Sequence, residues 1–164
     1  MPSLFLQRGC ARSQAATDLL RQAFLLGVRL YWGWQFAVTG WGKLHNLARV
    51  TAYFASLGIP FPGLNAPFVA GLEFAGGILL AAGLASRSIA LLLAGNMLVA
   101  YLAADREALL AFFSDPGKFY AAAPYTFLFA SIIILLFGPG AVSLDRLLAQ
   151  WWNSRVPVKH MTMP

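Results

Sequence analysis

Four long runs of apolar residues divide the chain. They cover about residues 19–41, 66–84, 88–104 and 121–137, and polar or turn-forming residues separate them. Each run is close to the roughly 20 residues that a helix needs to cross about 30 Å of hydrocarbon. Pro67 and Pro124 lie near helix starts, where a missing N–H is tolerated, and Gly138-Pro139-Gly140 ends the last run. The pattern predicts an all-α fold, a four-helix transmembrane bundle.

A shorter amphipathic pattern follows the last run. Ser143 is a suitable N-cap for a helix whose apolar residues share one face, namely Leu144, Leu147, Leu148, Trp151 and Trp152. This predicts a helix that lies at the membrane surface, and a docking helix for a soluble partner is the alternative. We therefore expect a basic N-terminal tail over residues 1–18, a membrane domain with this interfacial helix over residues 19–153, and a flexible tail over residues 154–164.

Two opposite charges lie inside the apolar runs, Arg29 in the first and Glu73 in the second. A charge at the centre of a bilayer costs roughly 2.5 to 3.5 kcal/mol on insertion scales, so each needs a partner. At about 1.5 Å per residue, Arg29 lies roughly 15 Å and Glu73 roughly 20 Å from the same membrane face. Lys43 lies more than about 10 Å further out by the same rise. The depths predict an ion pair between Arg29 and Glu73.

Small and polar residues accompany these charges. Gly33 and Gly40 share a helical face with the charge of the first run, and Gly76 and Gly77 share one with the charge of the second. Glycines allow two helix backbones to approach closely, so these four are predicted helix-packing positions. Asn96, in the third run, could add a hydrogen bond between helices.

Two interpretations of the polar centre remain open at this point. A buried ion pair can serve only to set the register of two helices. Alternatively, intramembrane charges mark a pocket for a quinone-like headgroup, an ion or a proton. The candidate residues for such a pocket are Arg29, Glu73, Lys43 and Asn96.

Composition supports a membrane protein. Of the 164 residues 59% are hydrophobic and 11% are charged, whereas about 25% are charged in a typical soluble domain. In a four-span topology, seven basic residues fall on the side of the termini, Arg8, Arg12, Arg21, Arg87, Arg146, Arg155 and Lys159, and four on the other side, Lys43, Arg49, Arg106 and Lys118. This bias predicts cytoplasmic N- and C-termini. It also explains the net charge of +6 without nucleic acid.

Candidates for metal or covalent chemistry are few. The single Cys10 excludes an intrachain disulfide and a cysteine-based metal cluster. His45 follows the first run and His160 lies near the C-terminus, and neither has a second histidine or cysteine nearby in the sequence. We expect no metal site and no covalently bound cofactor, and no catalytic residue can be named.

Several short patches occur in a specific order along the chain. They are Arg29, Gly40-Trp41-Gly42-Lys43-Leu44 and Gly58-Ile59-Pro60-Phe61-Pro62, followed by residues 73–80, 83–87, 138–140 and 143–145. In this order they resemble the DoxX family of bacterial membrane proteins. The resemblance covers about residues 23–148. One departure is Asp105-Arg106, which stands where family members often place a histidine.

The resemblance implies a multi-pass subunit of the bacterial cytoplasmic membrane, associated with a redox system, and it makes quinone the candidate cofactor. It also implies partners among membrane or redox subunits, or a homo-oligomer, besides the lipid bilayer. As the chain has no redox group of its own, we treat it as a component of an oxidoreductase at most. A non-catalytic accessory subunit that stabilises a larger complex is the alternative. A small transporter is disfavoured, because no broken helix is expected among the four spans.

Overall fold

Helices form all the regular structure in the described part of the chain, residues 3–155 of a computed structural model. The long helices are α1 (Ser3–His45), α3 (Pro62–Ala82), α4 (Ser86–Ala104) and α7 (Pro124–Phe137). The shorter ones are α2 (Leu47–Ser56), α5 (Arg106–Leu110), α6 (Pro116–Ala121) and α8 (Leu144–Arg155). The expected all-α fold is confirmed. Residues 156–164 of the expected flexible tail, with His160, lie outside the described residues.

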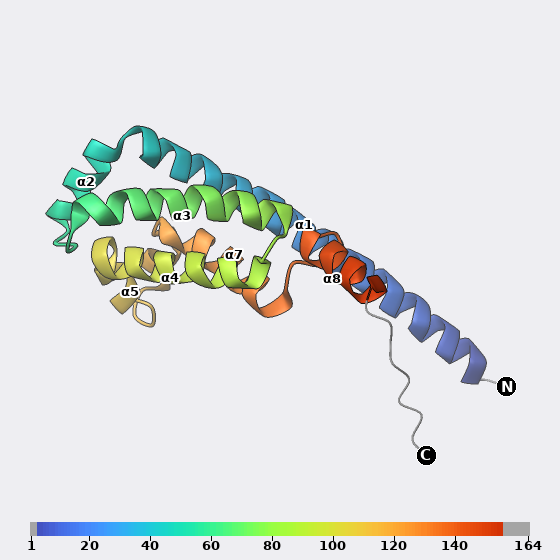
Figure 1. Ribbon diagram of the computed structural model, residues 1–164. Coiled ribbons are helices and arrows are strands. Elements are labelled where there is room, and N and C mark those ends of the chain that lie inside the picture. The colour runs from blue at the N-terminus through green and yellow to red at the C-terminus, as the bar shows by residue number, and fades with distance from the viewer. Residues whose placement is uncertain (1–2, 156–164) are drawn as a thin grey trace, which may run out of the picture.

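The helices run back and forth along one axis (Figure 1). The helix α1 packs mainly against α3, and α4 packs mainly against α7. The short helices α2 and α5 lie at one end of the molecule, which we call the α2 end. The helix α8 lies toward the opposite end, and we call this the α8 end.

Glycines bring α1 and α3 into backbone contact. A Cβ atom at Gly33 would lie 2.7 Å from the backbone nitrogen of Ala81, and one at Gly40 would meet the backbone of Phe74. From the other side, a Cβ atom at Gly77 would meet the backbone of Ala37. No larger residue fits at these positions without moving a helix, so the glycines fix the distance and the register of the two helices. Gly76 faces α4 instead, where a Cβ atom would lie 3.3 Å from Leu93.

The apolar core lies between α1, α3, α4 and α7. Its buried members include Phe36, Leu80, Leu93, Met97 and Ile134. Near the α2 end, Tyr101 stacks on Phe119, with ring centroids 4.9 Å apart, and its hydroxyl donates to the backbone oxygen of Phe119 at 2.8 Å. This contact anchors α6 to α4.

The predicted spans agree only in part with the helices. By length and composition α3 and α4 can cross a bilayer, whereas α7 is apolar but has 14 residues. At about 1.5 Å per residue α7 reaches roughly 21 Å, less than the hydrocarbon thickness. Two of the four predicted spans are therefore supported among the described helices. The first predicted span lies within α1, which already begins at Ser3, inside the expected basic tail.

The helix of the fourth predicted span begins three residues later than predicted. The helix α6 ends at Ala121, the next residue Ala122 is extended (φ −67°, ψ 139°), and α7 begins at Pro124. Proline lacks an N–H group and its ring crowds the preceding turn, so a helix breaks more readily here than continues. The predicted helix start at Pro124 is therefore confirmed, and α7 itself runs without a break to Phe137. The turn between α6 and α7, at Ala123 and Pro124, lies in the wall of the cavity described below.

Candidate functional site: a polar cluster in an apolar cavity

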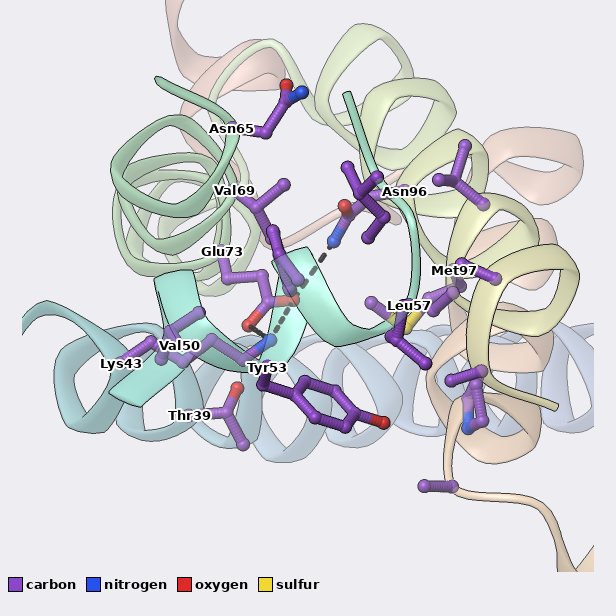
Figure 2. Close-up of a pocket in the computed structure, with 18 of the residues that line it drawn as sticks. Thr39, Lys43, Val50, Tyr53, Leu57, Asn65, Val69, Glu73, Asn96 and Met97 are labelled. Atoms are coloured by element: carbon purple, nitrogen blue, oxygen red, sulfur yellow. Dashed lines mark hydrogen bonds and ion pairs between the residues drawn. The ribbon is translucent and has the colours of Figure 1, made fainter. Parts of the chain in front are cut away.

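The polar centre of the molecule is formed by Lys43, Glu73 and Asn96, from α1, α3 and α4 (Figure 2). The Nζ atom of Lys43 donates to both carboxylate oxygens of Glu73, at 2.6 Å each. The Nδ2 atom of Asn96 donates to Oε1 of the same carboxylate at 2.9 Å. Three helices thus meet at one carboxylate, and charge-assisted hydrogen bonds of this kind are stronger than neutral ones.

The two charges of this cluster differ in burial. The side chain of Glu73 is 2% exposed, whereas that of Lys43 is 34% exposed. Lys43 extends along the helix surface toward the carboxylate, as long basic side chains do when they bury their stems and keep their charge accessible. The side chain of Lys43 is therefore much more accessible than that of Glu73, and both residues line the adjoining cavity.

That cavity has a volume of about 560 Å³ and is lined mostly by apolar side chains. Its size and its few polar groups are typical of pockets for small molecules. Residues from α1, α2, α3, α4 and the start of α7 form its wall, including Phe36, Thr39, Val50, Phe54, Val69, Met97, Val99, Ala100, Ala103, Asp105, Pro124 and Phe127.

The helix α2 and the loop that follows it cover one side of the cavity. Tyr53, Leu57, Ile59 and Pro60 from this segment contribute to the lining. The loop turns at Gly58, whose φ of +70° is accessible to glycine at little cost. Asn65 ties the loop to α3, since its Nδ2 atom donates to the backbone oxygen of Pro60 at 2.6 Å.

Arg29 does not take part in this cluster, and the predicted ion pair between Arg29 and Glu73 is wrong. Its Nε, Nη1 and Nη2 atoms donate to the backbone oxygens of Ala81, Pro139 and Val142, at 3.2, 2.5 and 2.6 Å. Arg29 is 3% exposed. Arg29 thus hydrogen-bonds to the end of α3 and to the loop after α7, and it links these two segments to α1 at the α8 end of the molecule.

The error has a physical reason. The prediction derived the register of α1 and α3 from depths, which were counted from uncertain span boundaries. In the structure, the glycine contacts set this register. Gly40 meets Phe74, the residue after Glu73, whereas Gly33 meets Ala81. This register places Lys43 near the carboxylate and moves Arg29 beyond it toward the end of α3.

Sequence reasoning missed two side chains at the α8 end. The carboxylate of Asp145 accepts from the backbone N–H groups of Ala85 and Ser86 at 2.7 and 2.9 Å, and so caps α4 from outside that helix. The oxygen of Gln22 accepts from the backbone N–H of Ala141 at 2.5 Å. Neither contact has a local sequence signal, because each joins residues more than 50 positions apart.

Comparison with known proteins identifies the family of the chain. The model of the DoxX family matches residues 24–106, which contain Arg29, Lys43, Glu73 and Asn96. The chain belongs to the DoxX family. It is 32% identical over 118 residues to the inner membrane protein YqjF of Escherichia coli (strain K12), and the match covers 71% of this chain and 85% of the relative. No solved structure matches the chain significantly.

The DoxX-family match and the cavity do not coincide completely. Residues 24–106 supply α2, α3, α4 and most of the membrane part of α1, so they supply the whole polar cluster. The far wall of the cavity, with Pro124 and Phe127, lies after the match. Within the described residues, no group of three or more His, Cys, Asp or Glu side chains is placed to hold a metal ion.

Proposed function

We propose that this membrane protein is a redox-associated subunit whose cavity binds the headgroup of a quinone or a quinone-like amphiphile. The observation that carries the proposal is the cavity of about 560 Å³ with the Lys43–Glu73–Asn96 cluster in an otherwise mostly apolar wall. Such a site can orient an apolar ligand by a few polar contacts.

The residues present fit a quinone headgroup. Lys43 has three N–H donors and uses two on Glu73, so one remains for a ligand carbonyl. The amide oxygen of Asn96 remains as an acceptor, while its nitrogen holds Glu73 in place. A bound quinone would supply the electron chemistry, which no side chain here provides. The protein would bind and orient the headgroup, and the apolar wall would exclude water.

The proposal includes a topology. The basic bias of the sequence places both termini in the cytoplasm, and the relative YqjF is described as an inner membrane protein. The α8 end would then face the cytoplasm, with α8 as an interfacial helix whose Trp151 and Trp152 are 50% and 65% exposed. The cavity would open toward the opposite side of the bacterial inner membrane.

A non-catalytic accessory subunit remains the second candidate, and one observation favours it. Gly27 and Gly95 lie on the molecular surface, and a Cβ atom at either would meet nothing within 4 Å. Small residues on a lipid-facing surface are common where another transmembrane helix packs. By contrast, Gly33, Gly40 and Gly77 are buried within the chain and cannot contact a partner.

A binding titration distinguishes the two candidates. Purified protein in lipid nanodiscs should bind ubiquinone with a one-isoprene tail, measured by titration calorimetry against empty nanodiscs. Asn96→Leu removes a polar contact of the headgroup but leaves the Lys43–Glu73 pair, so it should weaken binding by about tenfold or more. Asn153→Leu, in the exposed α8, is the matched control and should have no effect.

The accessory role predicts another pattern. The protein would then bind no quinone, and a bulky residue at Gly27 or Gly95 would release a specific membrane partner that co-purifies with the wild type. Absence of quinone binding in a folded wild-type protein contradicts the proposed pocket.

A further inference from the structure

The charges around the cavity restrict what it can hold. Lys43 is the only positive side chain in the described cavity wall, and two carboxylates, those of Glu73 and Asp105, also contribute to the wall. Both oxygens of Glu73 lie 2.6 Å from the Nζ atom of Lys43. The positive charge is thus already compensated, and Asp105 adds a second negative charge to the cavity.

An anionic headgroup meets repulsion in this geometry. To reach the remaining N–H of Lys43, a ligand carboxylate would have to lie beside the carboxylate of Glu73, since both Glu73 oxygens contact the same nitrogen atom. Like charges at such short range, away from bulk water, repel strongly. An uncharged carbonyl or hydroxyl meets no such repulsion and can still accept from Lys43 or donate to the oxygen of Asn96.

We infer that Glu73 determines the ligand class of the cavity: by compensating Lys43, it selects amphiphiles with an uncharged headgroup and rejects anionic ones such as fatty acids. The inference rests on the proposed function, because it requires that the cavity binds an amphiphile. Glu73 is then a specificity-determining residue as well as the junction of three helices. Its replacement by glutamine would leave Lys43 as a free cation in an apolar pocket, which is a site for anions.

A matched pair of probes tests this inference. The compounds 4-propylphenol and 4-propylbenzoate share a ring and a tail, and at pH 7.5 the first is neutral and the second anionic. Titration calorimetry on the full chain in nanodiscs should show the phenol binding at least about tenfold more tightly to the wild type. In Glu73→Gln the benzoate should gain at least about tenfold, while the phenol changes by less than about threefold.

Three variants serve as controls. Glu107→Gln makes the same change in net charge at an exposed position outside this cavity, and both affinities should stay as in the wild type. Lys43→Gln combined with Glu73→Gln removes the free cation, so the benzoate affinity should not show the increase expected in Glu73→Gln alone. Asp105→Asn leaves the Lys43–Glu73 ion pair intact and removes the other negative charge of the cavity wall, so the benzoate affinity should rise as it does in Glu73→Gln. This variant keeps the test valid if Glu73→Gln does not fold.

The outcomes separate this inference from the proposed function. If the benzoate binds the wild type as tightly as the phenol, or gains nothing in both Glu73→Gln and Asp105→Asn, the charge selection is wrong, while the amphiphile pocket stands. If neither compound nor the short-tailed ubiquinone binds the folded wild type, the pocket itself is wrong.

Discussion

At the scale of single residues, the two buried charges have separate tasks. Glu73 joins α1, α3 and α4 through Lys43 and Asn96, near the α2 end. Arg29 joins α1 to the end of α3 and to the loop after α7 through three backbone oxygens. A planar guanidinium with five donors can satisfy several carbonyls at once. Which of the two cations reaches Glu73 follows from the register that the glycine contacts of α1 and α3 impose.

The ion pair predicts an asymmetry between its two halves. Lys43→Met leaves the carboxylate of Glu73 buried without a counter-charge, and we expect a loss of about 3 to 5 kcal/mol in the free energy of unfolding. Glu73→Leu leaves Lys43 unpaired, but that side chain is 34% exposed and can turn into the cavity, so the loss should be smaller. Thermal unfolding followed by tryptophan fluorescence measures both.

The double variant provides the control for this pair. Lys43→Met with Glu73→Leu should recover much of the stability, because a buried ion pair replaced by apolar residues is often neutral. Arg29→Met with Glu73→Leu should show no such recovery. Recovery of stability in the Arg29→Met with Glu73→Leu variant, and not in the Lys43→Met with Glu73→Leu variant, would show that Glu73 pairs with Arg29.

At the scale of elements, the glycines of α1 and α3 set the geometry on which the site depends. Gly33 and Gly40 are seven residues apart and meet α3 near Gly77 and Ala70, which are also seven apart. This antiparallel match of small residues could have given the register from sequence. The predicted register used span boundaries instead, and these carry errors of several residues.

A pair of alanine substitutions tests the glycine contact. Gly40→Ala places a Cβ atom against the backbone of Phe74, and no side-chain rotation can relieve this. We expect a loss of about 1 to 3 kcal/mol and a shift of Lys43 relative to Glu73. Gly71→Ala, where a Cβ atom would meet nothing within 4 Å, is the matched control.

The control should behave in the opposite way. Alanine favours a helix over glycine by about 0.5 to 1 kcal/mol, so Gly71→Ala should be neutral or stabilising. Equal effects of the two substitutions in thermal unfolding would show that α1 and α3 do not touch at Gly40.

At the scale of the whole molecule, the sequence predicted the helical class and the family better than the site. Apolar periodicity located the long helices, because length and composition are local properties. Contacts between distant segments, such as Asp145 with the start of α4, have no local signal. Pro124 was predicted as a helix start, and α7 begins there. The separate short helix α6 before it was not predicted.

The topology of the whole molecule leads to a prediction about accessibility. With Cys10→Ser as background, a cysteine at Ser154 in α8 should be protected from an impermeant thiol reagent in spheroplasts. A cysteine at the exposed Ser114, near the α2 end, should be labelled. Labelling of the cysteine at position 154 but not of the one at position 114 would show the opposite orientation, with the cavity on the cytoplasmic side.

The central claim, that the cavity holds a quinone-like headgroup, is tested most directly by filling it. Ala100→Trp places an indole into the cavity, while Leu98→Trp adds one to the exposed, non-lining face of the same helix. Each protein would be extracted gently from its own membranes, and bound quinone quantified by mass spectrometry. We predict that the wild type and Leu98→Trp carry quinone and that folded Ala100→Trp does not. Equal quinone in all three proteins, or none in the folded wild type, would contradict the account.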